Sequence, residues 1–337
     1  MGPMVDDIED VTVVTSAGEL VRASRSEHPE LFSLVLGGYG LFGVIARATL
    51  RLGPRRKVRR LVDIVDIDDA MNAVYRRIDD GCLYGDFQYA IDPSDDAFLR
   101  RGVFTCYLPV PDDSQIDDIG SDLRREDWLH LLRLAHTNKA EAFRLYARHY
   151  LDTHGRIYWS DTMQSSTYIP SHAEFLAESL GQESQESLMI TELSVPPDAL
   201  IKFIHQARII LRTSGVEDIY GTIRAIRSDT TSFLPWAQGD RACVIFNLRT
   251  PHTAEGIDRS TRAARGLIDA AGELGGSFFL TYHRWATRAQ LLRCHPRLPA
   301  FLTAKSRHDP NDLFVSDWLR GIRTVLEPND ASPPPSR

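Results

Sequence analysis

The fold is decided by the stretch GGYGLFGVIARATLRL at residues 37–52. Its four glycines lie within seven residues: Gly37, Gly38, Gly40 and Gly43. Such a run permits positive φ angles and lets a ligand approach the main chain closely. From Val44 and Ile45 onward apolar residues alternate with Arg47, Thr49 and Arg51, and this pattern predicts a strand.

A glycine turn that enters a strand differs from the Rossmann fingerprint, in which the glycines precede a helix. The pattern alone leaves two interpretations open, a tight structural turn and a cradle for a ligand. Upstream, residues 11–24 predict a hairpin whose turn lies at residues 16–18. Residues 29–34 predict a short helix, with Pro29 at its first position.

Two runs of sequence together resemble a known family. Residues 10–54 (DVTVVTSAGELVRAS, then HPELFSLVLGGYGLFGVIARATLRLGP) resemble the second half of the FAD-binding domain of the vanillyl-alcohol-oxidase type, the PCMH-type flavoproteins. Residues 305–314 (KSRHDPNDLF) are similar to the closing Lys-x-x-x-Asp-Pro-x-x-x-Phe pattern of that family. The layout is most similar to bacterial FAD-linked oxidases related to decaprenylphosphoryl-ribose oxidases and aldonolactone oxidases.

The resemblance implies FAD as the cofactor. In that family the glycine turn and the first strand residues lie along the pyrophosphate and adenine, chiefly through main-chain groups. The implied cofactor-binding residues here are Gly37, Gly38, Gly40, Gly43, Val44 and Ile45. A first FAD subdomain normally precedes such a turn, and we expect this chain to lack it. We therefore expect weak FAD retention by the chain alone, and self-association or a partner that supplies the missing subdomain.

The resemblance also implies an α+β fold with a particular division of the chain. Residues 1–55 form the C-terminal part of a PCMH-type FAD-binding domain, and residues 56–275 form an antiparallel-sheet cap, or substrate, domain with helices on one face. Residues 276–325 return to the FAD domain, and residues 326–337 form a disordered tail.

Periodicity places the elements within this frame. Predicted strands cover residues 58–65, 83–91, 103–110, 188–195, 219–227, 242–249 and 277–282. Predicted helices cover residues 69–78, 127–150, 171–180, 198–212, 257–271, 287–294 and 296–306, followed by a final segment at 313–323.

The candidate catalytic residues Tyr282, His283 and Arg284 follow an apolar run at the predicted seam between the domains. Oxidation of an alcohol by a flavin requires removal of the hydroxyl proton and stabilisation of the reduced ring. Tyr282 or His283 is the candidate base, with histidine titrating near neutral pH, and Arg284 is the candidate source of charge. The alternative is a structural histidine beside an inter-domain ion pair.

Polar residues within the predicted cap strands form a second candidate group. Gln88, Glu192 and Arg224 would together make a polar ceiling over the cofactor, suited to a hydroxylated substrate. Glu192 is also the next candidate for the catalytic base after Tyr282 and His283, with Arg224 as its orienting partner. The alternative is a buried Glu192–Arg224 pair with a structural role. Residues 158–168 form an aromatic segment, and we expect Asp161, Gln164 and Tyr168 to lie on a loop there that gates the pocket.

Composition narrows the class of protein. The chain has 337 residues, 43% of them hydrophobic and 25% charged, with a net charge of −7, as in ordinary globular proteins. The basic residues are dispersed, apart from a cluster at residues 55–60 that we interpret as a solvated strand entry, so we expect no nucleic-acid partner. No apolar run of 18 residues and no leader is present, and the four cysteines lack metal-ligand spacing. We expect a cytoplasmic protein with free thiols, no membrane span and no metal.

The resemblance implies that the protein is an FAD-dependent oxidoreductase, a flavoprotein. It would oxidise a CH–OH group of a small sugar-like or polyol substrate by hydride transfer to flavin N5. The rival hypothesis is a non-catalytic remnant, or a complementing chain without stable FAD.

Overall fold

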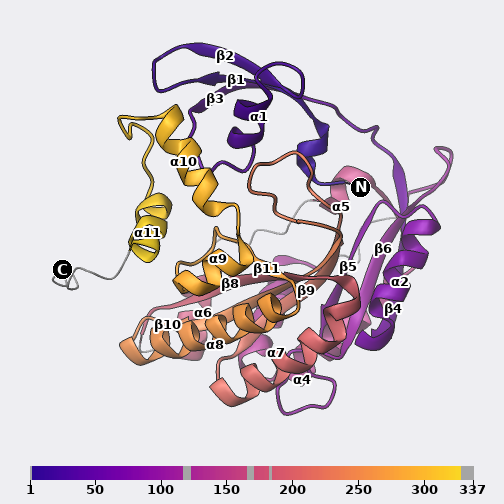
Figure 1. Cartoon of the computed structure of the whole chain (residues 1–337). Helices are drawn as coiled ribbons and strands as arrows, with labels where there is room; N and C mark the ends of the chain where they lie inside the picture. The colour runs from indigo at the N-terminus through magenta and orange to yellow at the C-terminus, as the bar shows by residue number, and fades with distance from the viewer. Residues whose placement is uncertain (1, 117–122, 165–170, 182–183, 328–337) are drawn as a thin grey trace. The chain divides into compact units, whose positions relative to one another are not determined.

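The computed structural model describes residues 2–116, 123–164, 171–181 and 184–327 (Figure 1). Its contacts divide the chain into two compact units. Unit 1 comprises Met1–Pro3, Leu52–Ser228 and Gly239–Phe279. Unit 2 comprises Met4–Arg51, Asp229–Gln238 and Leu280–Arg337.

Unit 2 is built on a three-stranded antiparallel sheet of order β2-β1-β3. A short 3-10 helix, η1 (Met4–Asp7), leads into β1 (Ile8–Val14), and β1 and β2 (Leu20–Ser24) form the predicted hairpin. Helix α1 (Pro29–Val35) starts at its proline, and β3 (Val44–Leu50) follows the glycine turn. The predictions for residues 8–50 are thereby confirmed.

Three helices near the C-terminus complete unit 2: α9 (Arg288–Cys294), α10 (Leu298–His308) and α11 (Asp317–Leu326). Aromatic rings join them to the glycine turn, since Tyr39 stacks on Trp318 with ring centroids 4.1 Å apart and Phe42 meets Phe301 edge-on at 5.0 Å. Lys305 is fully buried at the end of α10 and pairs with Asp309.

Unit 1 contains an eight-stranded antiparallel sheet of order β11-β8-β10-β9-β5-β6-β4-β7. Its strands are β4 (Lys57–Asp66), β5 (Tyr84–Tyr89), β6 (Arg101–Pro109), β7 (Ile157–Trp159), β8 (Glu186–Val195), β9 (Asp218–Ile226), β10 (Arg241–Pro251) and β11 (Ser277–Phe278). The α+β fold with a large antiparallel sheet is the one that the sequence predicts.

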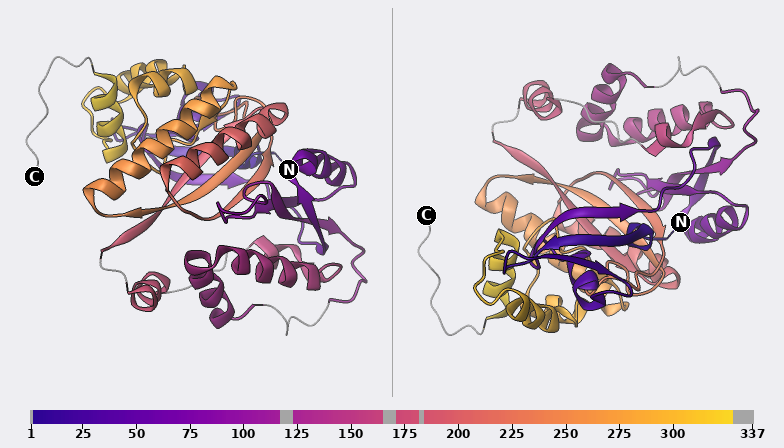
Figure 2. Two further views of the ribbon diagram at one scale, coloured as in Figure 1. Left: turned by 90° about the horizontal axis from the view of Figure 1, so that it is seen from below. Right: turned by 90° about the horizontal axis from the view of Figure 1, so that it is seen from above.

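Helices cover both faces of this sheet (Figure 2). One face carries α2 (Ile67–Asp79), α7 (Leu200–Ser214, after the 3-10 turn η2 at Pro197–Ala199) and α8 (Ala254–Glu273). The other carries α3 (Arg125–Thr137), α4 (Lys139–Asp152) and α6 (His172–Leu180). This second layer, which the sequence does not anticipate, forms one side of the cavity described below.

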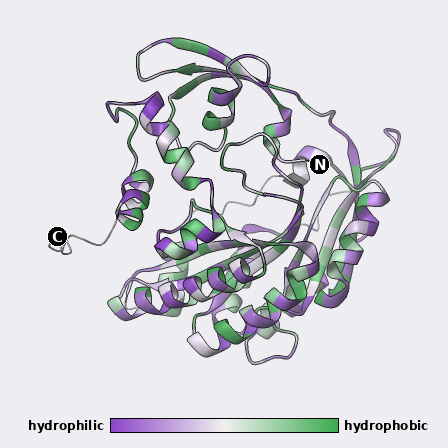
Figure 3. Cartoon of the chain, in the orientation of Figure 1, coloured by the Kyte–Doolittle hydropathy of each residue, from purple (hydrophilic) through white to green (hydrophobic). Residues whose placement is uncertain are grey.

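The core of unit 1 lies between the sheet and the α7–α8 pair. Phe203 and Ala207 of α7 are fully buried, and the Phe203 ring lies 6.4 Å from that of Phe246 on β10. Both helices carry hydrophobic and hydrophilic residues, as amphipathic helices do (Figure 3). Buried alanines such as Ala264 and Ala271 let α8 approach the sheet closely.

Two predicted elements are wrong. The predicted helix over 127–150 is two helices, because Asn138 leaves the helical conformation (φ −154°, ψ 79°) and its side chain accepts a hydrogen bond from the Glu141 amide, which starts α4. The predicted strand over 277–282 ends at Phe278, because the chain passes from unit 1 to unit 2 there and pairing with β8 stops.

Candidate functional site

A row of polar side chains crosses one face of the sheet in unit 1. Alternate residues of a strand point to opposite faces, so the register places Gln88, Thr222, Arg224 and Glu192 on one face. Gln88 Nε2 donates to Asp86 Oδ2 at 3.1 Å, and Thr222 Oγ1 donates to the same oxygen at 3.0 Å. We call Asp86, Gln88, Thr222, Arg224, Cys243 and Glu192 the polar row.

Members of the polar row differ in burial. Glu192 is buried and accepts a hydrogen bond from Cys243 Sγ at 3.3 Å, whereas Arg224 is exposed. Burial and the neighbouring Glu192 raise the pKa of the Cys243 thiol well above its usual value, so it remains a donor. The structure thus brings the predicted Gln88, Glu192 and Arg224 onto one face, while their roles stay predictions.

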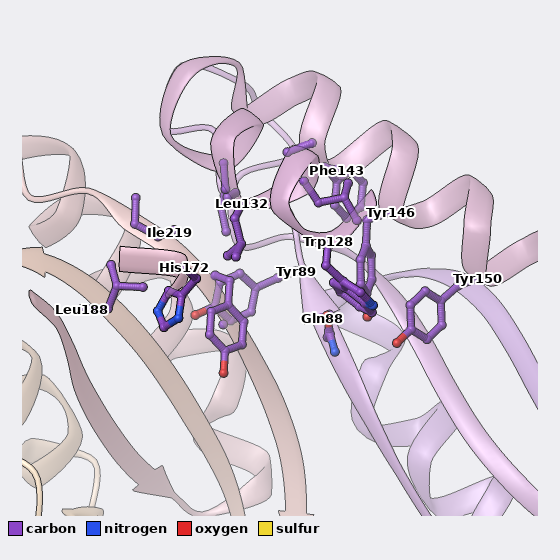
Figure 4. Close-up of a pocket in the computed structure, with 16 residues that line it drawn as sticks. Gln88, Tyr89, Trp128, Leu132, Phe143, Tyr146, Tyr150, His172, Leu188 and Ile219 are labelled. Atoms are coloured by element: carbon purple, nitrogen blue, oxygen red, sulfur yellow. The ribbon is translucent and has the colours of Figure 1, made fainter. Parts of the chain in front are cut away.

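A cavity of about 500 Å³ adjoins the polar row at Gln88 (Figure 4). It lies between the sheet, at β5, β8 and β9, and helices α3, α4 and α6. The lining residues are Gln88, Tyr89, Ile91, Trp128, Leu131, Leu132, Ala135, Ala142, Phe143, Tyr146, Tyr150, His172, Leu188, Ile219, Tyr220 and Gly221.

Arg60 attaches the α3–α4 hairpin to the sheet. This buried side chain of β4 donates to Thr153 Oγ1 at 2.7 Å, just after α4, and to Tyr107 Oη at 3.2 Å. Its guanidinium also lies over the rings of Tyr158 and Tyr150, at 4.7 and 5.1 Å. The helical wall of the cavity is therefore held by a buried cation among aromatic rings.

A fully buried carboxyl lies behind the sheet wall of the cavity. Burial raises the pKa of Asp218 to about 7. Its Oδ2 lies 2.9 Å from Tyr89 Oη, which is also 2.7 Å from the Ile245 carbonyl oxygen. The one hydroxyl proton of Tyr89 can be donated to either of these two acceptors.

The glycine turn of unit 2 combines packing with exposed main chain. Gly37, Gly40 and Gly43 have positive φ angles of 70°, 72° and 136°, as predicted for such a turn. A Cβ at Gly43 would meet Val14 O at 2.5 Å and one at Gly38 would meet Leu34 O at 2.0 Å, so these two positions are needed for packing. A Cβ at Gly40 would meet nothing within 4 Å.

The strand after the turn is open as well. All seven residues of β3 are exposed, with Val44 at 56% and Ile45 at 45%. The exposure of Gly40, Val44 and Ile45 fits a cofactor that lies along them, whereas Gly38 and Gly43 serve the turn itself.

The predicted catalytic segment lies in unit 2, in irregular structure after β11. The His283 ring stacks on Trp285 at 4.8 Å, and its Nδ1 has no hydrogen-bond partner among the described residues. Burial lowers the pKa of His283 to about 4, below the range usual for histidine, so the ring is neutral at pH 7. Tyr282 is 36% exposed, and the Arg284 side chain lies against Gly321 of α11. The predicted catalytic set is divided between the two units.

The predicted gating loop is only in part described. Residues 160–164 form a short helix, α5 (Ser160–Gln164), so the prediction of a loop is wrong for these residues. Asp161 on this helix pairs with Arg55 at 2.9 Å, and Arg55 lies over the Trp159 ring at 4.1 Å. The Gln164 side chain and Tyr168 lie outside the described residues.

The aromatic wall of the cavity and Asp218 are not among the residues predicted from the sequence. Trp128, Phe143, Tyr146 and Tyr150 fall within the region predicted as a single helix, and their concentration there was the available pattern. In the sequence Asp218 is only an acidic residue that precedes a predicted apolar strand, and nothing in that pattern indicates its burial. Within the part of the chain that the structure describes, no group of three metal-binding side chains occurs, and no helix is long and apolar enough to cross a membrane.

Part of the chain is similar in sequence to a class of oxidoreductases, the cytokinin dehydrogenases. Cytokinin dehydrogenase 2 of Oryza sativa subsp. japonica is 42% identical over 64 residues, 19% of this chain and 11% of that protein. Cytokinin dehydrogenase 6 of the same plant is 40% identical over 67 residues, 20% and 13% of the two chains. Cytokinin dehydrogenase 2 of Arabidopsis thaliana is 32% identical over 125 residues, 35% and 23% of the two chains.

The matched segments thus span less than a quarter of the length of these relatives. No family model matches the chain. The partial similarity agrees with the broader resemblance to FAD-linked oxidoreductases, and the α+β antiparallel sheet agrees with the cap expected for them. The narrower bacterial subfamily stays a prediction.

Proposed function

We propose that this chain is part of an FAD-dependent oxidoreductase that oxidises a CH–OH group of a small molecule. The observation that carries the proposal is the sequence similarity of part of this chain to cytokinin dehydrogenases, at 42% identity over 64 residues in one of them and 32% over 125 residues in another. The polar row adds support, since it presents hydrogen-bonding groups on one face of the sheet in unit 1.

The residues of unit 2 fit the cofactor in one respect. FAD bound there would supply the acceptor for a hydride. Gly40, with open space around its α-carbon, and the exposed β3 residues Val44 and Ile45 would hold it through main-chain groups.

The side chains have separate tasks in this proposal. Gln88, Thr222 and Arg224 orient a sugar-like or polyol substrate by its hydroxyl groups, and Glu192 is held for the same purpose by Cys243. His283, whose buried Nδ1 has no hydrogen-bond partner among the described residues, and Tyr282 are the two candidates for accepting the hydroxyl proton, and Arg284 supplies positive charge.

Titration of the purified chain with FAD, followed by flavin fluorescence, tests the cofactor assignment. Gly40→Val should abolish the remaining binding, because a β-branched residue adopts positive φ poorly and blocks close approach. Gly18→Val is the matched control: Gly18 also has positive φ (79°) and open space, but lies in the β1–β2 turn. Equal FAD binding by both variants would make the glycine turn structural only.

The exposed strand β3 favours one second candidate, a chain that is completed by a partner. An unpaired strand edge is a ready site for another chain. If the purified chain binds no FAD but binds it when mixed with a separately encoded FAD subdomain, the complementing role holds; if neither preparation binds FAD, the oxidoreductase proposal fails.

A further inference from the structure

We propose that the cavity of unit 1 is a binding site for a neutral, largely apolar ring compound that carries one hydroxyl or N–H group. The proposal concerns unit 1 alone and does not depend on bound FAD. The cavity has a volume of about 500 Å³, which falls within the range of binding sites for small organic ligands.

Aromatic and aliphatic side chains make up most of the cavity wall. Figure 4 shows Phe143, Tyr146 and Tyr150 projecting from the helices, with Leu188 and Ile219 on the side of the sheet. The Tyr146 and Tyr150 rings lie 4.4 Å apart, so flat surfaces line this end. Flat rings pack well against such walls, because aromatic faces combine a large contact area with offset or edge-on contact.

The wall also excludes charged ligands and disfavours polyols. No lysine, arginine, aspartate or glutamate is among the described residues that line the cavity. A charged ligand would lose its hydration there without gaining a partner. The polar groups of the lining, on Gln88, Trp128, His172 and four tyrosines, stand within a mostly apolar wall, so this cavity favours an apolar ring over a polyol.

Two polar groups can fix the orientation of a bound ring. The Gln88 amide nitrogen donates to Asp86, and no described residue donates to the amide oxygen, which is left for a ligand. Trp128 lines the cavity, and its indole N–H makes no hydrogen bond to any described residue. A single ligand hydroxyl can donate to Gln88 or accept from Trp128, which accounts for the one polar group in the proposed ligand class.

Equilibrium binding of three probes to the purified chain, measured by calorimetry, tests the ligand class. We expect 2-naphthol to bind saturably at one site, and 2-methoxynaphthalene, which cannot donate, to bind about tenfold more weakly. Sorbitol should show no binding. Gln88→Met should remove the preference for 2-naphthol, since it keeps the side-chain length but lacks the acceptor. Failure of 2-naphthol to saturate, or tighter binding of sorbitol, would overturn the proposal.

A pair of variants on α4 tests the location. Ala142 is buried and lines the cavity, whereas Ala140 on the same helix is exposed. Ala142→Phe should fill the cavity and lower 2-naphthol affinity at least tenfold, while Ala140→Phe should leave it unchanged. Unchanged binding by a folded Ala142→Phe chain would place the probe elsewhere, such as on the exposed apolar strand β3, and would refute the site.

Circular dichroism of both phenylalanine variants establishes that they fold. If Ala142→Phe unfolds, Gln88→Met provides the test of location. A probe that binds outside the cavity should keep its preference for 2-naphthol over 2-methoxynaphthalene in that variant. Since no measurement uses FAD, a negative result leaves the proposed oxidoreductase function standing.

Discussion

At the scale of single residues, burial decides which groups carry charge. Loss of hydration favours the neutral forms of His283 and Asp218, because it lowers the pKa of the histidine to about 4 and raises that of the acid to about 7. Lys305 stays paired with Asp309 in the core of unit 2. None of these environments follows from residue type.

Asp218 gives a pH dependence of known sign. An unfolded aspartate has a pKa of about 3.9, below the folded value of about 7, so the folded chain holds its proton more tightly. Stability therefore falls as the pH rises from about 4 to about 7, and the full penalty is present above pH 7. Asp218→Asn removes this penalty while retaining an oxygen for the Asn247 amide, which bonds Asp218 at 2.8 Å.

Urea unfolding at two pH values checks this prediction. The stability of Asp218→Asn relative to the natural chain should be about 2 kcal/mol more favourable at about pH 8 than at about pH 5. Asp113→Asn, at an exposed position, is the control and should show no such change. A difference that is independent of pH would contradict a raised pKa.

At the scale of elements, the α3–α4 hairpin shapes the cavity and β3 leaves an open edge. The hairpin depends on the break at Asn138, and its attachment depends on Arg60. Strand β3 has the alternating pattern of a half-buried strand, yet no residue of it is buried.

Asn138→Ala should loosen the first turn of α4. The lost cap costs about 1 kcal/mol, because the Glu141 amide loses the oxygen that accepts its hydrogen bond. Hydrogen exchange should speed up at the first amides of α4 and not in α8. Thr253→Ala, which removes the cap of α8 in the same way, should give the reverse pattern.

Val44→Lys should reduce self-association of the chain. Exposed apolar side chains on an unpaired edge strand favour pairing with another chain, and a lysine there opposes it. Light scattering should show a smaller mass for Val44→Lys than for Ile209→Lys, which places the same charge at an exposed isoleucine of helix α7, away from any strand edge. A natural chain that is already a monodisperse monomer would refute this expectation.

At the scale of the whole molecule, the chain forms two compact units, each built from three separate segments of the sequence. Unit 2 gathers residues from both ends of the sequence and a short central stretch. Its core contains the Lys305–Asp309 pair, and Asp309 also accepts hydrogen bonds from the amides of Leu313 and Phe314.

Lys305→Met should destabilise unit 2 selectively. Removal of the lysine leaves a buried carboxylate without its cation, which costs about 3–5 kcal/mol. In scanning calorimetry one transition should move to lower temperature while that of unit 1 stays. Arg320→Met breaks an exposed pair with Asp317, so it should change the free energy of unfolding of either unit by no more than about 1 kcal/mol. Equal movement of all transitions would show that the units do not unfold separately.

The sequence by itself determined the elements whose pattern is local. The alternation in β4 and β10, the helical spacing of α7 and the glycine turn with its positive φ angles all follow from short-range sterics and periodicity. The shared face of Asp86 and Gln88 on one strand, and that of Thr222 and Arg224 on another, was also accessible, because strand alternation has a fixed period of two; the register between strands then brought the two pairs together.

Only the tertiary structure decided the break at Asn138, the end of β11 at Phe278, the aromatic cavity and the protonation of Asp218 and His283. Each depends on which distant segments meet: a cavity needs two walls, and a pKa shift needs the neighbours that exclude water. Periodicity describes one segment at a time and carries no information about its partner, so these features had to come from the folded chain.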